Sequence, residues 1–207
     1  MQIYRALLIG NGEEVTARLL KSLARQAGYI LAADGGADKA LRANVTPHGV
    51  IGDLDSVSAR TKELLQHNIL HVLTQENTDL EKALLWLIQH KFTHITLVGF
   101  VGDRWDFSVG NLLVLAKYAK KLNLCVAGNN WRIYPLVRSA KFDCKKNKRV
   151  SIIPLKTCKN VTLTGLKYPL KNERLTAGIT RTLSNQTTST QFSVSFTHGS
   201  LLVYQET

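Results

Sequence analysis

Short apolar runs alternate with segments of helical spacing along the first 127 residues of this 207-residue chain. The apolar runs have the length of buried strands and fall at residues 3–9, 29–33, 50–51, 69–72, 95–98 and 124–127. Between them, apolar side chains recur every three or four positions, most clearly at Leu80, Ala83, Leu84 and Leu87. This alternation predicts an α/β fold in which helices cover both faces of a parallel sheet.

The pattern changes after about residue 138, where the helical spacing fades. Runs rich in β-branched and aromatic residues predict strands at residues 150–153, 161–164, 192–196 and 201–204. His198 and Gly199 predict a hairpin turn between the last two of these strands. We therefore expect an α/β domain at residues 1–137 and a smaller all-β, sandwich-like domain at residues 138–207.

Positive charge is concentrated in the second part of the chain. The formal net charge is +12, and residues 138–207 hold 12 of the 27 lysines and arginines against 3 of the 15 acids, which leaves +9 there. Clustered basic side chains attract polyanions, so a non-catalytic RNA-binding protein is one alternative. The basic part lacks the interleaved aromatic side chains of a base-stacking surface, which disfavours nucleic acid as a partner.

The apolar runs and the cysteines indicate the compartment. No run approaches the length of a membrane-spanning helix, and the first residues lack the layout of a signal peptide. Cys125, Cys144 and Cys158 are odd in number and lack the spacing of metal ligands, which is typical of free thiols. Because free thiols persist in reducing compartments, we expect a cytoplasmic protein with no membrane partner.

A pair of carboxylates, Asp53 and Asp55, comes just after the short apolar run at residues 50–51 and a glycine. Two close anions repel each other unless a positive group lies between them. Mg²⁺ prefers oxygen ligands and commonly binds together with substrate phosphates, so a magnesium site is one interpretation. The alternative is an acidic turn in which Asp55 or Ser56 caps the next helix, and the short motif alone favours this alternative.

Further polar residues follow other predicted strands. Ligands bind beyond the carboxyl ends of parallel strands, and Asp34 is expected at such an end. Asp34 either supports the metal ligands or contacts a nucleotide. Thr78 and Glu81 have the spacing of a capping box, which places Asp79 in the first turn of a helix. Asp79 either complements the helix dipole or adds a third metal ligand, with Gln75 as a neutral oxygen nearby.

The segment at residues 99–106 supplies glycines, a guanidinium and a carboxylate. Arg104 offers a planar fork of donors that suits a phosphate. The alternative is a surface ion pair between Arg104 and Asp106. Asn111, on the next predicted helix, is either a polar residue near the cap or a ligand contact.

Taken together and in this order, these motifs resemble the thiamin pyrophosphokinase family. The resemblance rests on Asp34-Gly35-Gly36, residues 52–56, Gln75 with Thr78, Asp79 and Lys82, Arg104 with Asp106, residues 164–170, and Ser184-Asn185. These motifs span nearly the whole chain.

The resemblance implies a transferase that moves pyrophosphate from ATP to thiamin and releases AMP. It implies Mg²⁺ as the cofactor, a homodimer with the thiamin site at the subunit contact, and catalytic roles for the metal-binding acids. The site residues that we expect are Asp53, Asp55, Asp79 and Gln75 for Mg²⁺, Asp34, Thr78, Arg104, Asp106 and Asn111 for ATP, and Ser184 and Asn185 for thiamin.

Three positions depart from the family's pattern. Bacterial relatives commonly have glycine where Asp103 stands, histidine where Phe107 stands, and an acid where Gln186 stands. These departures concern the nucleotide loop and a polar thiamin contact, and none touches the expected metal ligands. A pyrophosphokinase for another small alcohol, such as a pterin, and a catalytically inactive sensor of thiamin or nucleotide are the remaining alternatives.

Overall fold

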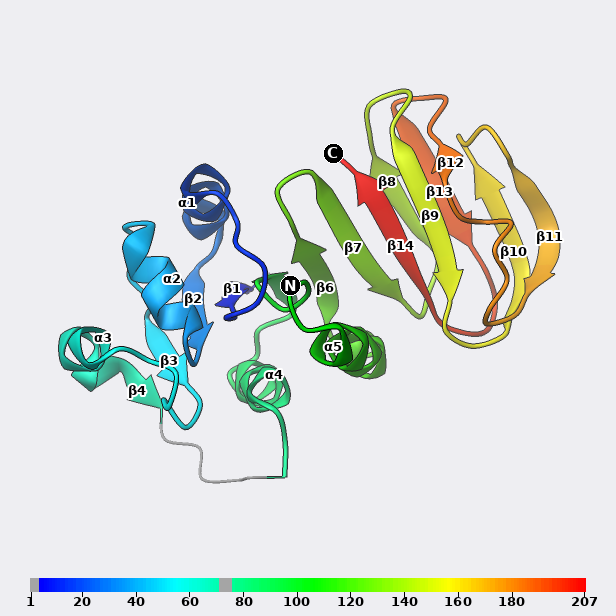
Figure 1. Cartoon of the computed structure of the whole chain (residues 1–207). Coiled ribbons are helices and arrows are strands. Elements are labelled where there is room, and N and C mark those ends of the chain that lie inside the picture. Colours follow the sequence, from blue (N-terminus) through cyan, green and yellow to red (C-terminus); the bar gives the residue numbers. More distant parts are fainter. Residues whose placement is uncertain (1–3, 71–75) are drawn as a thin grey trace. The chain divides into compact units, whose positions relative to one another are not determined.

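A computed structural model describes residues 4–70 and 76–207 (Figure 1). The chain forms two compact units. One contains the chain up to Val114 together with Lys121–Asn129, and the other contains Leu115–Lys120 and Asn130–Thr207. The second unit thus begins earlier in the chain than the boundary at residue 137 that charge and periodicity predicted. The functional roles predicted for the two domains stay predictions.

The first unit is built on a parallel sheet (Figure 1). Its strands are β1 (Arg5–Ile9), β2 (Tyr29–Ala33), β3 (Gly49–Ile51), β4 (Ile69–Leu70), β5 (His94–Val98) and β6 (Asn123–Ala127). They lie in the order β6-β5-β1-β2-β3-β4. From β1 the sheet continues through β2, β3 and β4 on one side and through β5 and β6 on the other. The strand order therefore reverses between β1 and β5. Ligands of open α/β sheets bind at such a point, beyond the carboxyl ends of the strands.

Helices cover both faces of this sheet. They are α1 (Ala17–Gln26), α2 (Gly36–Arg42), α3 (Ala59–Leu64), the 3₁₀ helix η1 (Gln66–Asn68), α4 (Asp79–Gln89) and α5 (Trp105–Tyr118). Successive side chains of a strand point to opposite faces. Ile30 of β2 shares a core cluster with Leu20 of α1, whereas the neighbouring Tyr29 stacks on Trp86 of α4. The predicted α/β architecture is confirmed, and no helix of the described residues is long and apolar enough to cross a membrane.

The second unit is an all-β structure, as predicted (Figure 1). Its strands are β7 (Trp131–Leu136), β8 (Ala140–Asp143), β9 (Arg149–Pro154), β10 (Cys158–Thr164), β11 (Leu170–Leu175), β12 (Asn185–Gln186), β13 (Gln191–Ser195) and β14 (Leu201–Glu206). Antiparallel pairing gives the orders β12-β9-β14-β7 and β11-β10-β13-β8. Inward side chains of both sheets, among them Ile152, Val203, Leu163 and Phe192, share one apolar core. This arrangement is the expected sandwich.

The hairpin predicted at His198 and Gly199 is wrong. The strands on either side of this turn belong to different sheets, because β13 pairs with β8 and β10 whereas β14 pairs with β7 and β9. Gly199 has φ of +111°, and a Cβ atom there would lie 2.6 Å from the Cys158 sulfur. The glycine therefore serves a close crossing between the two sheets instead of a two-strand turn.

Candidate active site

A pocket of about 620 Å³ opens at the carboxyl ends of the strands of the first unit. Its lining comes from five loops or helix starts, at residues 10–12, 33–34, 53–56, 78–80 and 99–111. At the floor, the loops after β1 and β5 approach each other closely, since Gly10 N donates to the Val98 carbonyl at 2.8 Å. A Cβ atom at Gly10 would lie 2.6 Å from the Gly99 carbonyl oxygen, so this approach requires glycine.

Three carboxylates gather in this pocket. Each of Asp34, Asp53 and Asp55 offers an oxygen atom, and these atoms lie within 4.8 Å of one another. The backbone bends to achieve this, because Gly52 and Leu54 have φ of +139° and +67°. Asp53 Oδ1 also accepts a hydrogen bond from Asp55 N at 3.1 Å, which closes an Asx-type turn. The sequence thus forms a tight turn that presents both of its acids to the pocket.

Asp34 is the partly buried member of this cluster. Its Oδ2 accepts a hydrogen bond from Ser56 Oγ, whereas its Oδ1 is buried and has no hydrogen-bond partner among the described residues. Burial raises the pKa of the Asp34 carboxyl, the Ser56 hydrogen bond lowers it, and the charges of Asp55, Asp79 and Asp53 raise it further. A buried carboxylate oxygen without a donor, beside two more carboxylates, suits a hard divalent cation.

Asp79 lines the same pocket but is not one of the three gathered acids. Its Oδ1 lies 3.0 Å from Lys82 Nζ, one helical turn further along α4. Thr78 is the N-cap of α4 as predicted, and its hydroxyl accepts a hydrogen bond from Glu81 N at 3.4 Å. Asp34 therefore stands closer to Asp53 and Asp55 than the sequence indicated, and Asp79 remains a predicted ligand. Gln75 lies outside the described residues.

Arg104 and Asp106 form the exposed ion pair that the sequence offered as an alternative. Arg104 donates from Nε to Asp106 Oδ1 at 3.2 Å and from Nη2 to Oδ2 at 2.5 Å. The guanidinium carbon also lies 4.3 Å from the centre of the Phe107 ring. The pair of hydrogen bonds lowers the pKa of Asp106 and raises that of Arg104. The ion pair with Asp106 occupies one edge of the guanidinium and leaves another edge without these contacts. Since Arg104 lines the pocket, that other edge can contact a ligand there.

Several residues shape the loops without being reactive themselves. The buried Asn111 donates to the Phe100 carbonyl at 2.7 Å and so holds the loop after β5 in place. Lys39 Nζ donates to the Gly12 carbonyl, and the Asn11 side chain packs against Gly35. Sequence reasoning missed Lys39. The spacing of Lys39, three residues after Gly36 on a helix that follows a strand, was the available signal.

Ser184 and Asn185 line a separate pocket of about 290 Å³ in the second unit. Ser184 has φ of +53° and an exposed side chain, and its N donates to Ser151 Oγ at 2.9 Å. Asn185 is buried, and its side-chain amide makes two hydrogen bonds with the backbone of Tyr168. Tyr168 N donates to Asn185 Oδ1 at 3.0 Å, and Asn185 Nδ2 donates to the Tyr168 carbonyl at 2.8 Å. Asn185 therefore fixes the wall of this pocket, whereas Ser184 presents a hydroxyl.

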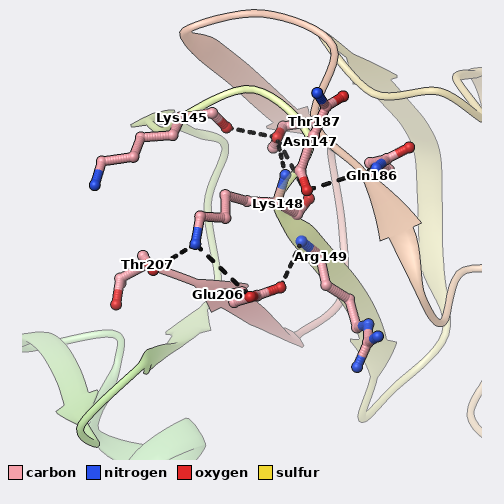
Figure 2. Close-up of polar contacts among 8 residues, drawn as sticks. All are labelled: Lys145, Asn147, Lys148, Arg149, Gln186, Thr187, Glu206 and Thr207. Atoms are coloured by element: carbon pink, nitrogen blue, oxygen red, sulfur yellow. Dashed lines mark hydrogen bonds and ion pairs between the residues drawn. The ribbon is translucent and has the colours of Figure 1, made fainter.

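A polar network borders this second pocket (Figure 2). Lys148 Nζ donates to the Thr207 carbonyl at 2.9 Å and lies 3.7 Å from Glu206 Oε1. Arg149 N donates to Glu206 Oε2 at 3.2 Å. Gln186 Nε2 donates to the Asn147 carbonyl at 3.5 Å. Glu206, the acid that lines the pocket, is thus already paired with a lysine.

An Asp34→Asn variant is expected to melt higher than the original protein in metal-free buffer. The folded-state pKa of Asp34 lies above its ordinary value of 3.8, so ionisation of this group opposes folding at neutral pH. The gain in melting temperature should be full at pH values above the raised pKa, and it should vanish as the pH falls through that pKa towards 3.8. Thermal unfolding with EDTA should show a rise of about 2–4 °C at pH 7. A lower melting temperature there would contradict the burial argument.

Comparison with known families identifies both parts of the chain. Residues 20–126 match the model described as "Thiamin pyrophosphokinase, catalytic domain". Residues 139–201 match the model described as "Thiamin pyrophosphokinase, vitamin B1 binding domain". The first match contains the three gathered carboxylates, and the second contains Ser184 and Asn185.

Known relatives agree with these matches. The thiamine pyrophosphokinase of Bacillus subtilis (strain 168) is 32% identical over 185 residues, which cover 84% of this chain and 85% of the relative. The crystal structure of thiamine pyrophosphokinase from Bacillus subtilis superposes with a TM-score of 0.87 at 25% identity, covering 98% of this chain and 99% of that one. The enzyme from Candida albicans shares the fold, with a TM-score of 0.87 at 19% identity over 99% of this chain and 89% of that one. The chain therefore belongs to the thiamin pyrophosphokinase family.

Proposed function

We propose that this protein transfers pyrophosphate from ATP to the hydroxyethyl group of thiamin, giving thiamin diphosphate and AMP. The family membership supplies the reaction. The observation that carries the assignment to this site is the gathering of Asp34, Asp53 and Asp55 beyond the carboxyl ends of β2 and β3, in the pocket that also contains the loops after β1 and β5. A polyphosphate substrate needs positive charge around its oxygens, and acids in this position bring a cation to it.

The cofactor in this proposal is Mg²⁺, held by Asp34, Asp53 and Asp55. When bound, the ion neutralises the ATP phosphates and polarises the phosphorus that is attacked. The buried, unpartnered Oδ1 of Asp34 supports this choice, because a carboxylate oxygen in that condition is stabilised by a cation. Asp79 would be a further ligand of the cation, and its ion-pair partner Lys82 would then be available to an ATP phosphate. The protein's own contribution is thus to hold negative charge in fixed positions around the cation.

Arg104 orients the ATP phosphates. Asp106 and Phe107 hold its guanidinium in one plane, so the free edge can donate two parallel hydrogen bonds to phosphate oxygens. Such donors stabilise charge that develops as the bond to the departing AMP breaks. Asn111 and Thr78 act on ATP indirectly in this proposal, by fixing the loop after β5 and the start of α4.

In this proposal the protein is a homodimer, and thiamin binds to the second unit of the partner subunit. The match to a vitamin B1 binding domain supports this part, as does the exposed Ser184 hydroxyl in a preformed pocket. Sedimentation should show a dimer at micromolar concentration, and a monomer would oppose the shared site.

The free thiols of Cys125, Cys144 and Cys158 support a cytoplasmic location.

Incubation with ATP, Mg²⁺ and thiamin is expected to yield AMP and thiamin diphosphate in equal amounts. The attack is on the β-phosphorus, so AMP is the leaving group. Product analysis by ion-exchange chromatography distinguishes this reaction from simple phosphorylation. ADP in place of AMP would rule out pyrophosphoryl transfer, and turnover with a pterin alcohol but not with thiamin would favour the other acceptor.

A further inference from the structure

One carboxylate of α2, outside the pocket lining, has protein donors on both of its oxygens. Asp38, in the first turn of α2, accepts from Ser58 N at 3.0 Å through Oδ2. Its Oδ1 accepts from Ser58 Oγ at 2.5 Å and from Thr61 Oγ1 at 2.6 Å. Ser58 is the N-cap of α3, and its own hydroxyl accepts from Thr61 N at 3.3 Å. A single side chain of α2 therefore fastens the start of α3.

This attachment bears on the turn that carries two of the gathered acids. Residues 52–57 connect β3 to α3, and their first end is fixed by the sheet, where Asp34 N donates to the Ile51 carbonyl at 2.9 Å. The far end is fixed at Ser58 by Asp38. Asp53 and Asp55 lie between these two points and are exposed. Their distance from Asp34 consequently depends on both attachments.

The carboxylate of Asp38 differs from the gathered acids in its hydrogen bonds. Burial acts to raise the pKa of its carboxyl, but hydrogen bonds from Ser58 and Thr61 together bring the pKa below its ordinary value. Both of its oxygens already accept from protein donors, whereas Asp34 Oδ1 has none among the described residues. Asp38 is thus a charged acceptor for the protein and not a member of the cation-binding set.

We propose that Asp38 is a positioning residue of the metal site, which sets the affinity for Mg²⁺ by holding the Asp53–Asp55 turn against Asp34 through Ser58 and Thr61. The proposal rests on the proposed function for the identity of the cation. Groups that orient the ligands of a metal change its affinity by about 10–100-fold when they are removed. The same carboxylate makes no contact with substrate in this proposal.

The decisive variant is Asp38→Asn. An asparagine oxygen can still accept from the two hydroxyls, but its amide nitrogen then faces the Ser58 N–H, and two donors oppose each other. Titration calorimetry with Mn²⁺, without ATP or thiamin, should show about tenfold weaker binding. In turnover assays the Mg²⁺ concentration for half-maximal rate should rise by a similar factor, while kcat at saturating Mg²⁺ stays within about twofold of the original.

Two further variants separate geometry from charge. Thr61→Val removes one hydrogen bond and keeps the Asp38 charge, and about a threefold weakening of Mn²⁺ binding is expected from the loosened attachment. Glu63→Gln removes a charge from the exposed side of α3 and should leave Mn²⁺ affinity unchanged. If Asp38→Asn does not fold, Thr61→Val carries the test by itself.

The outcomes are distinct. Unchanged Mn²⁺ affinity in both Asp38→Asn and Thr61→Val would overturn the proposal, even if their melting temperatures fall. Weaker binding in Asp38→Asn but not in Thr61→Val would also overturn it, because the effect would then be one of charge. A protein that binds Mn²⁺ but converts no thiamin would refute the proposed function alone, and the calorimetric comparison would still decide the role of Asp38.

Discussion

Replacing Asp55 by asparagine is expected to lower kcat about a thousandfold without unfolding the protein. Its side chain is exposed and accepts no hydrogen bond from the described residues, so a neutral side chain of the same shape disturbs no structural contact. The change removes one of the three gathered charges that we propose as ligands of the cation. A metal ion supplies several kcal/mol of charge stabilisation in the transition state, and each ~1.4 kcal/mol is a factor of ten in rate.

The measurement is steady-state turnover of ATP and thiamin across a range of Mg²⁺ concentrations. Asp55→Asn should fail to recover at high Mg²⁺, since a neutral amide oxygen is a poor substitute for a carboxylate. Glu63→Gln, with the same loss of charge on the exposed part of α3, should retain the original rate. Retention of more than a third of the activity by Asp55→Asn would show that the cluster does not hold the catalytic cation.

The position of the site could be predicted because it follows from strand order. Asp34, Asp53 and Gly99 each come within two residues of the end of an apolar run, and the carboxyl ends of parallel strands meet at one edge of the sheet. The grouping of the acids within the site could not be predicted. It depends on the left-handed backbone of Leu54 and on the ion pair that draws Asp79 towards Lys82, and neither has a signal in spacing alone.

The second unit was harder to predict. The strands β9, β10, β13 and β14 show the β-branched and aromatic pattern of a half-buried sheet, and each was predicted within a few residues. β11 escaped notice because Lys171, Asn172 and Glu173 are consecutive polar residues that interrupt the alternating pattern, and Pro135 within β7 disfavours a strand. The crossing at Gly199 looked like a hairpin because glycine serves tight turns and close approaches equally.

The role of Asn185 shows a different limit. Its place in the Ser184-Asn185 motif predicted a thiamin contact, and that role stays a prediction. Its amide is held by the backbone of Tyr168, which lies 17 residues away in the sequence. A contact of this kind forms only when the chain folds, so the sequence cannot distinguish a pocket wall from a ligand contact. Ser184 is the stronger candidate for a direct contact, because its side chain is exposed in the pocket.

Replacing Arg104 by lysine is expected to lower kcat/KM for ATP about a hundredfold, although the charge is kept. Asp106 occupies the Nε–Nη2 edge of the guanidinium and leaves the Nη1–Nη2 edge for phosphate oxygens. A lysine ammonium is a point charge and cannot donate to Asp106 and to two phosphate oxygens in one plane. Loss of one preorganised donor commonly reduces turnover by about 10²–10³. Initial rates at varied ATP and saturating thiamin give the measurement.

The neighbours of Arg104 provide the matched comparison that separates a phosphate contact from a surface ion pair. Asp106→Asn keeps an acceptor for Nε but weakens the anchor, so a smaller loss of about tenfold is expected, mainly in KM for ATP. Phe107→Leu removes the ring that lies 4.3 Å from the guanidinium and should act in the same direction, while Phe107→His keeps an aromatic face and should be mild. If Arg104 were only a surface partner of Asp106, all of these variants would keep kcat/KM for ATP within about twofold, because exposed ion pairs contribute little to stability. A graded loss, largest for Arg104→Lys, therefore requires the guanidinium to contact the nucleotide.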